Sequence, residues 1–416
     1  MSRGDRIITA LDLGSHKVRV AILLISQVQD LKVIGYGESP AHGIRRGQII
    51  DLKEAVESIK EAVALASKSG NIKISKITLG LGGVHFRLMD SKGAIAVSRA
   101  DGEISQDDVN RVLDSARAIS LPANREIVHT IPSEYIIDGD EKTKDPVGMR
   151  GVRLEANVIL ILGSTPVLKM ARKAVQDSGL ELESIIYSPL AASRAVLTKK
   201  RKELGSVSVD IGSGSTGISV WEESQLKFAS VLPIGSSLIT NDVAIGLRIA
   251  PELSEKIKTE FGCCFAANVS RREQLVLADW GVENMVMSKF ELARIIEARL
   301  CEIFDMIGEE LKKSGKANFL PAGVVLSGGG VRLEGVVELA KKRLKLPVEI
   351  GRVREVKSDF SEFFNPDSAT LAGALLYQYE REQEALFHRS AISSEKKNSG
   401  EGFWAKAREW FSELIP

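Results

Sequence analysis

The chain has 416 residues, 44% hydrophobic and 27% charged, which is long enough for two or more domains with substantial cores. Its formal net charge of +1 gives no electrostatic argument for nucleic-acid binding, and its three cysteines favour neither a disulfide framework nor a metal site. Because we find no signal-peptide pattern and no apolar run near the ~20 residues of a membrane-spanning helix, we expect a cytoplasmic protein.

Two β-rich runs near the N-terminus are joined by a tight turn. Strands are predicted within residues 7–25 and over 31–38, and the first two flank Asp12-Leu13-Gly14-Ser15. Such a turn presents backbone N–H groups and hydroxyls to an anion, although a lone turn of this kind is usually only a turn. A helix over 53–69 and a strand over 71–80 follow, and this order predicts a mixed sheet covered by helices.

Residues 84–162 differ in character from their flanks. Strands are predicted near 95–98 and over 127–132, with a helix over 106–119 between them. We interpret this stretch as a separate small α/β subdomain, and a plain structural excursion is the alternative.

A second turn of the same kind lies at Asp210-Ile211-Gly212-Ser213-Gly214-Ser215-Thr216. It separates strands predicted over 206–210 and 216–221, and a third strand is predicted over 227–234. A later strand runs into Gly328-Gly329-Gly330, a loop that lets a flat ligand approach the backbone. Two anion-binding turns and a glycine loop in this order predict a nucleotide site far more specifically than any one of them.

Residues 241–316 are predicted to be mostly helical. In a helix over 250–262, Glu255 and Lys258 share one face, and a simple surface ion pair is the alternative to a binding role. A second helix over 289–313 has an apolar stripe, and Arg299 lies off that stripe.

Three more helices are predicted. One covers 332–344 and begins beside the glycine loop, where free N–H groups would favour an anion. The others, over 188–197 and 368–384, are rich in small residues that permit close packing.

The C-terminus combines a polar stretch with an aromatic one. Residues 386–401 are predicted to be a flexible linker because they are rich in Ser, Lys, Glu, Asn and Gly. Residues 402–416 are predicted to form an amphipathic helix that inserts into a membrane interface. Its membrane-facing and flanking residues are Phe403, Trp404, Lys406, Ala407, Arg408, Trp410, Phe411, Leu414 and Ile415. A terminal helix folded onto the protein's own core is the alternative.

The order of these motifs resembles that of the superfamily of actin, the sugar kinases and the large heat-shock chaperones. Within it the chain resembles the FtsA family, the actin-like bacterial cell-division proteins, through the first turn up to Val18, Gly35-Tyr36-Gly37 and Gly43-Ile44-Arg45-Arg46-Gly47. The resemblance covers about residues 5–380 and returns at the C-terminus. It implies an α/β fold, the actin-like two-domain ATPase fold, with an inserted small α/β subdomain and a C-terminal amphipathic helix.

The resemblance also implies how the chain is divided. The first actin-like half would be residues 1–83, completed by about 163–188 and 366–385, and the second would be 189–240, completed by about 317–365. The helices over 188–197 and 368–384 would cross at the hinge between the halves. The inserted subdomain 84–162 would serve interaction and polymerisation, and the helical subdomain 241–316 would hold the ribose side and the FtsZ-docking surface.

The resemblance implies ATP and magnesium in the cleft between the halves. The expected nucleotide-binding residues are Asp12, Gly14, Ser15, His16, Lys17, Asp210, Gly212, Ser213, Gly214, Ser215, Thr216, Glu255, Lys258, Gly328, Gly329 and Gly330. Among them Asp12 and Asp210 would order magnesium through water, Glu255 and Lys258 would hold the ribose, and the glycine loop would face adenine. The first hinge helix lacks Asp, Glu and Gln and carries Arg194, so we expect at most weak ATPase activity.

The function implied is an adaptor that polymerises at the cytoplasmic membrane, tethers the FtsZ ring and recruits later divisome proteins. Arg299 is the position we match to a contact with the acidic C-terminal peptide of FtsZ. One alternative is a pilus-assembly actin-like ATP-binding adaptor, and another is a sugar or metabolite kinase, which would need a catalytic Asp. A chaperone is disfavoured because no separate substrate-binding domain follows residue 385.

Overall fold

The computed structural model describes residues 5–276, 286–315 and 320–395, and its core consists of two sheets with the same strand order. In the first sheet the order is β11-β6-β1-β2-β3-β19, and in the second it is β14-β13-β12-β17-β18. Each sheet has an antiparallel meander of three strands, extended by strands that pair in parallel. The prediction of a mixed sheet whose order recurs after residue 206 is confirmed.

The first sheet comprises β1 (Arg6–Leu13), β2 (Lys17–Ile25), β3 (Leu31–Pro40), β6 (Lys76–Leu81), β11 (Glu181–Tyr187) and β19 (Lys357–Ser358). Helix α1 (Leu52–Gly70) packs on β2 and β3, and α3 (Thr165–Asp177) lies beside α1. The backbone N–H of Glu54 donates to Asp51 at the start of α1, and Asn71 ends it in the left-handed conformation, φ 50°. This cap delays the strand predicted from residue 71 until Lys76.

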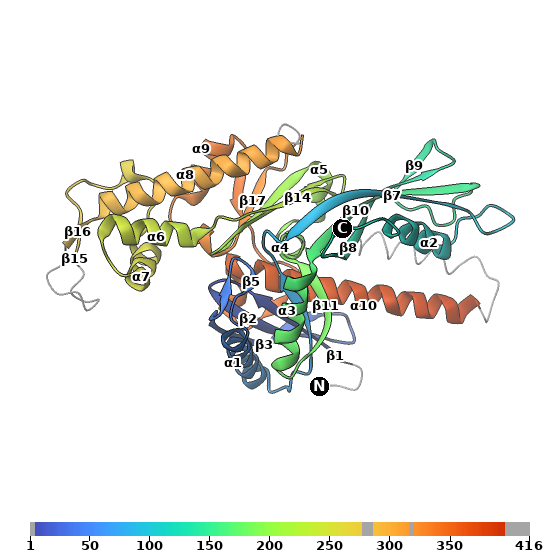
Figure 1. Cartoon of the computed structure of the whole chain (residues 1–416), viewed down its shortest axis with the longest axis horizontal. Helices are drawn as coiled ribbons and strands as arrows, with labels where there is room; N and C mark the ends of the chain where they lie inside the picture. The colour runs from blue at the N-terminus through green and yellow to red at the C-terminus, as the bar shows by residue number, and fades with distance from the viewer. Residues whose placement is uncertain (1–4, 277–285, 316–319, 396–416) are drawn as a thin grey trace.

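The second sheet comprises β12 (Ser206–Ile211), β13 (Thr216–Glu222), β14 (Gln225–Leu232), β17 (Val324–Ser327) and β18 (Val348–Ile350). The short helix α5 (Lys199–Leu204) precedes it, and α9 (Val336–Leu344) packs beside β18. At the left end of Figure 1 lie α6 (Ser236–Leu247), α7 (Pro251–Phe261), η1 (Ala266–Asn268), the hairpin β15 (Gln274–Val276) and β16 (Val286–Ser288), and α8 (Lys289–Lys313). Helix α8 has the bounds that its apolar periodicity predicts.

A third sheet, with the order β7-β10-β8-β9, has a core of its own. Its strands are β7 (Phe86–Ala96), β8 (Arg125–Ile137), β9 (Glu141–Thr143) and β10 (Arg153–Ser164), and α2 (Gln106–Arg117) covers one face. The prediction of a strand near 95–98 is wrong in its bounds, because β7 begins at Phe86 and ends at Ala96. Polar residues such as Arg87, Asp90 and Lys92 interrupt the apolar run and hide this strand in the sequence.

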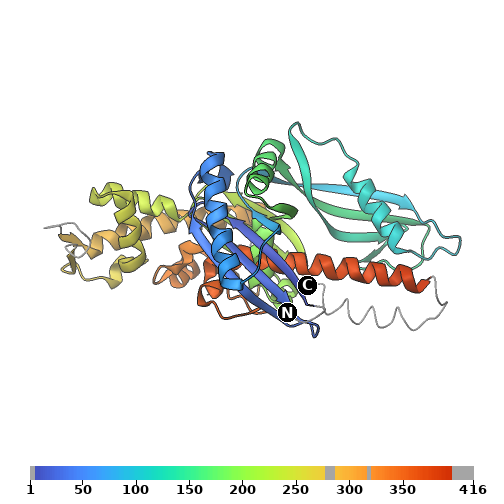
Figure 2. The ribbon, with the colours of Figure 1, turned by 90° about the horizontal axis from the view of Figure 1, so that it is seen from below.

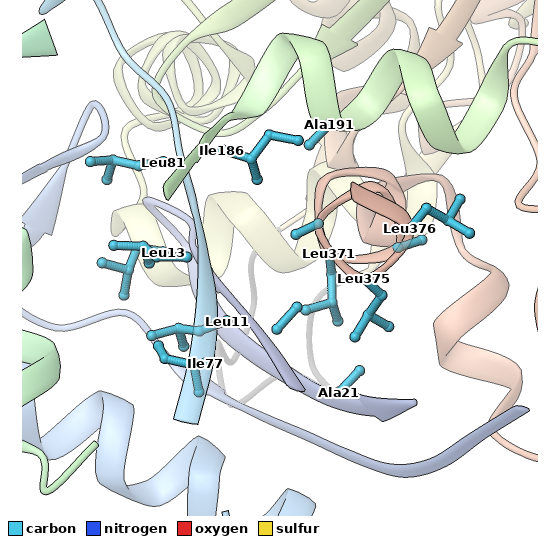
Figure 3. Close-up of a cluster of buried hydrophobic side chains, with 14 of the residues drawn as sticks. Leu11, Leu13, Ala21, Ile77, Leu81, Ile186, Ala191, Leu371, Leu375 and Leu376 are labelled. Atoms are coloured by element: carbon cyan, nitrogen blue, oxygen red, sulfur yellow. The ribbon is translucent and has the colours of Figure 1, made fainter. Parts of the chain in front are cut away.

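Two helices cross between the first two sheets. These are α4 (Ser188–Val196) and α10 (Ala369–Glu395), and their small residues let them come very close. A Cβ on Gly373 would lie 1.8 Å from the carbonyl oxygen of Ala191, so the crossing admits no side chain there. Figure 3 shows Ala191 above Leu371 and Leu375 of α10, which face Leu11 of β1 across the core. Burial of each such Leu stabilises the fold by about 1.5–3 kcal/mol.

The C-terminal elements differ from the prediction at three places. A 3-10 turn, η3 (Gly329–Arg332), follows the glycine loop, and α9 begins only at Val336 because Gly335 has a φ of 83°. Two further 3-10 turns, η4 (Ser361–Phe364) and η5 (Pro366–Ser368), precede α10. Helix α10 continues to Glu395 through part of the predicted linker, and Figures 1 and 2 show it running out beside the third sheet. No Gly or Pro interrupts the sequence from Leu375 to Glu395, so local propensity supports the extension.

The predicted amphipathic helix over 402–416 lies outside the described residues. In the ranges that are described, no helix is both long and apolar enough to cross a membrane.

Candidate functional site

The first of two facing hairpins is formed by β1 and β2. Their register pairs Leu13 with Val18, so residues 14–17 form the turn. A Cβ on Gly14 would lie 2.6 Å from the carbonyl oxygen of Lys17, so the turn closes too tightly for any other residue without a backbone shift. The ammonium of Lys17 forms an ion pair with Glu38 of β3.

The imidazole of His16 is exposed at the tip of the first turn. The surrounding protein nevertheless desolvates it in part and lowers its pKa; Glu255 opposes this shift, and the cations Lys17 and Lys258 add to it. The environment of His16 therefore favours its neutral form.

The second hairpin is formed by β12 and β13. Their register pairs Ile211 with Thr216, so residues 212–215 form the turn, and the N–H of Gly212 donates to the carbonyl of Ser215 at 2.9 Å. A Cβ on Gly214 would lie 2.9 Å from the hydroxyl of Ser15 in the first turn. The two turns therefore face each other at van der Waals distance.

A cleft of about 530 Å³ lies between the two hairpins. Fifteen of the sixteen predicted nucleotide-binding residues line it: Asp12, Gly14, Ser15, His16, Lys17, Asp210, Gly212, Ser213, Gly214, Ser215, Glu255, Lys258, Gly328, Gly329 and Gly330. Thr216 is the exception, since it is fully buried and its hydroxyl donates to the carbonyl of Ile234 at 2.8 Å. Its hydroxyl holds the second hairpin against the following segment and faces away from the cleft lining.

Two carboxyl groups lie at the floor of the cleft, those of buried Asp12 and half-buried Asp210. Burial raises the pKa of Asp12 to about 7, although Arg19 opposes the shift. Burial likewise raises the pKa of Asp210 to about 6, against a hydrogen bond of 3.0 Å from the hydroxyl of Ser327. A cation bound beside either carboxyl would therefore stabilise its charged form and lower its pKa.

Two charged residues at the same floor, Arg19 and Asp367, were not predicted as site residues. The guanidinium of Arg19 is ion-paired with Asp367, lies 3.5 Å from Glu38 and 4.0 Å from Asp12. Burial alone would lower the pKa of Arg19, but Asp367 and Asp12 outweigh it and raise the pKa. A single cation inside the apolar strand Val18-Arg19-Val20, directly opposite Asp12, was the available signal for Arg19.

The predicted ribose pair lies on α7 at the wall of the cleft. The ammonium of Lys258 is 2.6 Å from the carboxylate of Glu255 and 2.9 Å from the hydroxyl of Thr240 on α6. Burial would raise the pKa of Glu255, but Lys258 outweighs it and lowers the pKa. Lys258 is only 4% exposed, which is far from an ordinary surface pair. Thr240 was not predicted, and its hydroxyl also bonds to Glu255.

The glycine loop packs directly on the second hairpin. Gly328 has a φ of 91°, and a Cβ on it would lie 2.4 Å from the carbonyl oxygen of Ile211. Its N–H donates to the carbonyl of Pro366 at 2.9 Å. The loop therefore exposes backbone to the cleft, as predicted, but it is followed by a 3-10 turn rather than by the N-terminus of a helix.

The hinge helix α4 contributes Ser188 and Pro189 to the cleft lining. Arg194 of the same helix forms an ion pair with Glu380 of α10. Its guanidinium also lies 5.5 Å from the ring centre of Tyr377. Arg194 thus joins the two crossing helices and takes no part in the cleft.

The predicted partner residue Arg299 has an intramolecular partner. Its guanidinium bonds to both carboxylate oxygens of Asp242, at 2.6 and 3.0 Å, and to Glu302 at 2.5 Å. It keeps 26% of its side chain exposed on α8.

Asp12 and Asp210 lie close enough together that the charge of Asp210 raises the pKa of Asp12, as does that of Asp367. In the part of the chain that the structure describes, no three His, Cys, Asp or Glu side chains are grouped to hold a metal ion. The two carboxyls suit a cation that keeps most of its waters and takes further ligands from a phosphate, as Mg²⁺ does.

Comparison with known proteins gives two matching family profiles. The profile described as an SHS2 domain inserted in FTSA matches residues 83–162, and the one described as cell division protein FtsA matches residues 207–373. The chain is 34% identical over 385 residues to the cell division protein FtsA of Pseudomonas aeruginosa, covering 92% of each chain.

Solved structures with the same fold are much more distant in sequence. A PilM–PilN type IV pilus biogenesis complex matches with a TM-score of 0.64 and 14% identity, over 89% of this chain and 98% of that one. MreB 5 of Spiroplasma citri bound to AMPPNP matches with a TM-score of 0.54 and 12% identity, over 92% and 99%. These likenesses establish an actin-like fold.

Proposed function

The chain belongs to the FtsA family of actin-like cell-division proteins, and from this premise we propose that it binds magnesium-ATP and polymerises at the cytoplasmic membrane. There it tethers the FtsZ ring and recruits later divisome proteins. The observation that carries the nucleotide proposal is the pair of facing hairpins, each with an Asp below its turn that lines the cleft. The likeness to PilM concerns the fold, whereas the family relation concerns division, so we prefer division to pilus assembly.

The nucleotide is proposed to lie along the cleft with its phosphates between the turns at residues 14–17 and 212–215. Backbone N–H groups and the Ser15 hydroxyl suit phosphate oxygens. Glu255 and Lys258 would bind the ribose, and the glycine loop would pack on adenine. The fold shared with MreB 5 bound to AMPPNP supports this proposal.

Magnesium is proposed to bind through water to Asp12 and Asp210, where it would neutralise phosphate charge. Both carboxyls are driven towards their neutral form by burial, and a bound cation would restore their charge. With no acid or amide on α4, this chain would hold the nucleotide and hydrolyse it slowly at most.

Attachment to the membrane is proposed to use residues 402–416. One such helix binds lipid reversibly, so several protomers in a polymer would be needed for stable residence. The third sheet, within residues 84–162, is proposed to contribute contacts between protomers. Arg299 is proposed to meet the acidic peptide of FtsZ, whose carboxylates would share the guanidinium with Asp242 or displace that residue.

Co-sedimentation with anionic vesicles tests the adaptor role. We expect the full chain to carry FtsZ to the vesicles and a chain ending at Gly400 to stay in the supernatant. Trp410→Glu should abolish binding because it places a charge on the apolar face, whereas Glu413→Gln on the polar face is the control. Vesicle binding by the truncated chain would refute the tail's role, and binding without recruitment of FtsZ would refute the tether.

Calorimetric titration with ATP in magnesium buffer tests the nucleotide site. Asp210→Ala should weaken ATP binding by about 100-fold or more, because a group that orders the cation is lost. Asp359→Ala removes an acid whose side chain is 78% exposed, and it should change nothing. Equal affinities of wild type and Asp210→Ala would contradict the site.

A further inference from the structure

A small hairpin of the first half reaches across the mouth of the cleft. It consists of β4 (Ile44–Arg45) and β5 (Gln48–Ile49), joined by Arg46 and Gly47. Both turn residues have left-handed φ values, 48° for Arg46 and 72° for Gly47. A side chain of arginine's size in this conformation costs on the order of 1 kcal/mol, so the fold holds Arg46 there against its local preference.

The turn of this hairpin touches both of the facing hairpins. The N–H of Gly47 donates to the hydroxyl oxygen of Ser15 at 3.1 Å, so the hydroxyl proton of Ser15 is left to point elsewhere. A Cβ on Gly214 would lie 3.0 Å from both the backbone nitrogen and the Cα of Arg46. Gly47 is itself wedged in place, because a Cβ on it would lie 2.0 Å from the carbonyl oxygen of Gly82.

The backbone of Arg46 is thus fixed where the two turns meet. Within the described ranges, the close contacts of this turn do not include Glu255, Lys258 or the loop Gly328–Gly330. It therefore lies at the hairpin end of the cleft, where the phosphates are proposed to bind.

The other positive groups at the hairpin end are already neutralised. Lys17 is paired with Glu38, Arg19 is paired with Asp367, and the environment of His16 lowers its pKa and favours its neutral form. The side chain of Arg46 is exposed, and it has no hydrogen bond or ion pair to any residue in the described ranges. Lys256 and Arg332 also line the cleft, on the side of α7 and the glycine loop, whereas the backbone of Arg46 contacts the turns themselves, so Arg46 can supply a cation to a polyphosphate bound between them.

We propose that Arg46 binds the terminal phosphate of the nucleotide and makes the site distinguish a nucleoside triphosphate from a diphosphate. The proposal rests on the proposed nucleotide function of the cleft. A guanidinium suits this role because it can donate two parallel hydrogen bonds to phosphate oxygens. Since the backbone of Arg46 contacts Gly214 of the opposite half, the same contact also ties the two halves together while the phosphate is bound.

The test compares ATP and ADP affinities of the full chain by calorimetry in magnesium buffer. Arg46→Ala should weaken ATP binding by about tenfold or more, because hydrogen bonds to a charged group are lost, and should change ADP binding by less than about twofold. Arg45→Ala is the matched control, since Arg45 is an adjacent exposed arginine whose backbone is not among the close contacts of Gly214, and it should leave both affinities unchanged.

Each other outcome has a definite meaning. Wild-type ATP affinity in Arg46→Ala, or an equal loss in Arg45→Ala, would overturn the proposal while ATP binding by the wild type left the nucleotide site standing. Equal losses for ATP and ADP would overturn the assignment to the terminal phosphate. Failure of the wild type to bind either nucleotide would refute the nucleotide function itself.

Discussion

The two facing hairpins share the arrangement of two antiparallel strands joined by a four-residue turn, but the polar residues around their Asp side chains differ. Asp12 lies opposite Arg19 in the register of the first hairpin, whereas Asp210 lies opposite Gly217 in the second. A Cβ on Gly217 would lie 2.8 Å from Pro189. The start of α4 therefore occupies the position in the second half that the side chain of Arg19 occupies in the first. Asp210 relies instead on the hydroxyl of Ser327.

This difference shows how a repeated fold acquires an asymmetric site. The strand order needs only apolar faces and tight turns, which both halves supply. The charge on the floor of the cleft depends on which side chain stands across from each Asp. The first hairpin therefore contributes ion pairs, and the second contributes mainly backbone groups and hydroxyls.

Removing Arg19, the buried cation of the first hairpin, should have the largest effect on stability. Arg19→Leu should lower the free energy of unfolding by about 3–5 kcal/mol, because it leaves Asp367 and Asp12 buried without their cation. Urea unfolding measures the change. Arg172→Leu is the control, since its pair with Glu126 is much more exposed and should contribute less than about 1 kcal/mol. Similar losses in the two variants would contradict the view that the buried pair organises the floor.

The turns themselves should respond unequally to a single methyl group. Gly14→Ala places a Cβ 2.6 Å from the backbone carbonyl oxygen of Lys17, while Gly212→Ala places one 3.1 Å from that of Ser215. We expect Gly14→Ala to cost about 1–3 kcal/mol of unfolding free energy. The cost of Gly212→Ala should stay below about 1 kcal/mol, because alanine also restricts the unfolded chain. Chemical denaturation of both variants measures the difference, and equal costs would show that the turns are equivalent.

A further expected effect is in the pH dependence of stability. Burial raises the pKa of Asp12 to about 7 and that of Asp210 to about 6, above the unfolded value near 3.9. Between these limits the folded state holds protons that the unfolded state has lost, so the contribution of each group is present at low pH and lost as pH rises.

Substituting each Asp by Asn shows the pH range over which its carboxyl affects stability. Relative to the wild type, Asp12→Asn should gain about 1 kcal/mol of stability per pH unit up to about pH 7, and Asp210→Asn should gain similarly up to about pH 6. Thermal unfolding without nucleotide or magnesium between pH 4.5 and 7.5 is the measurement, with Asp359→Asn as the exposed control. A stability difference that does not change with pH would mean that neither carboxyl is protonated in the folded state.

Local sequence determined the repeating elements of this protein. The apolar runs on either side of Asp-x-Gly-Ser predict both hairpins, and the periodicity of residues 289–313 predicts α8 to its ends. Residues near one another in sequence fix these elements, because strand alternation, helix periodicity and tight turns are local properties. The glycine and Asp positions in the cleft followed from the same turns.

Tertiary structure decided the polar chemistry of the site and several boundaries. Asp367 reaches Arg19 across 348 positions of sequence, and Thr216 turns to Ile234 instead of the cleft. Gly335 delays α9, and Asn71 delays β6, because each takes a left-handed conformation that the apolar pattern does not encode. Which charges meet at the floor of a cleft depends on how distant segments pack, and the local sequence carries no record of that packing.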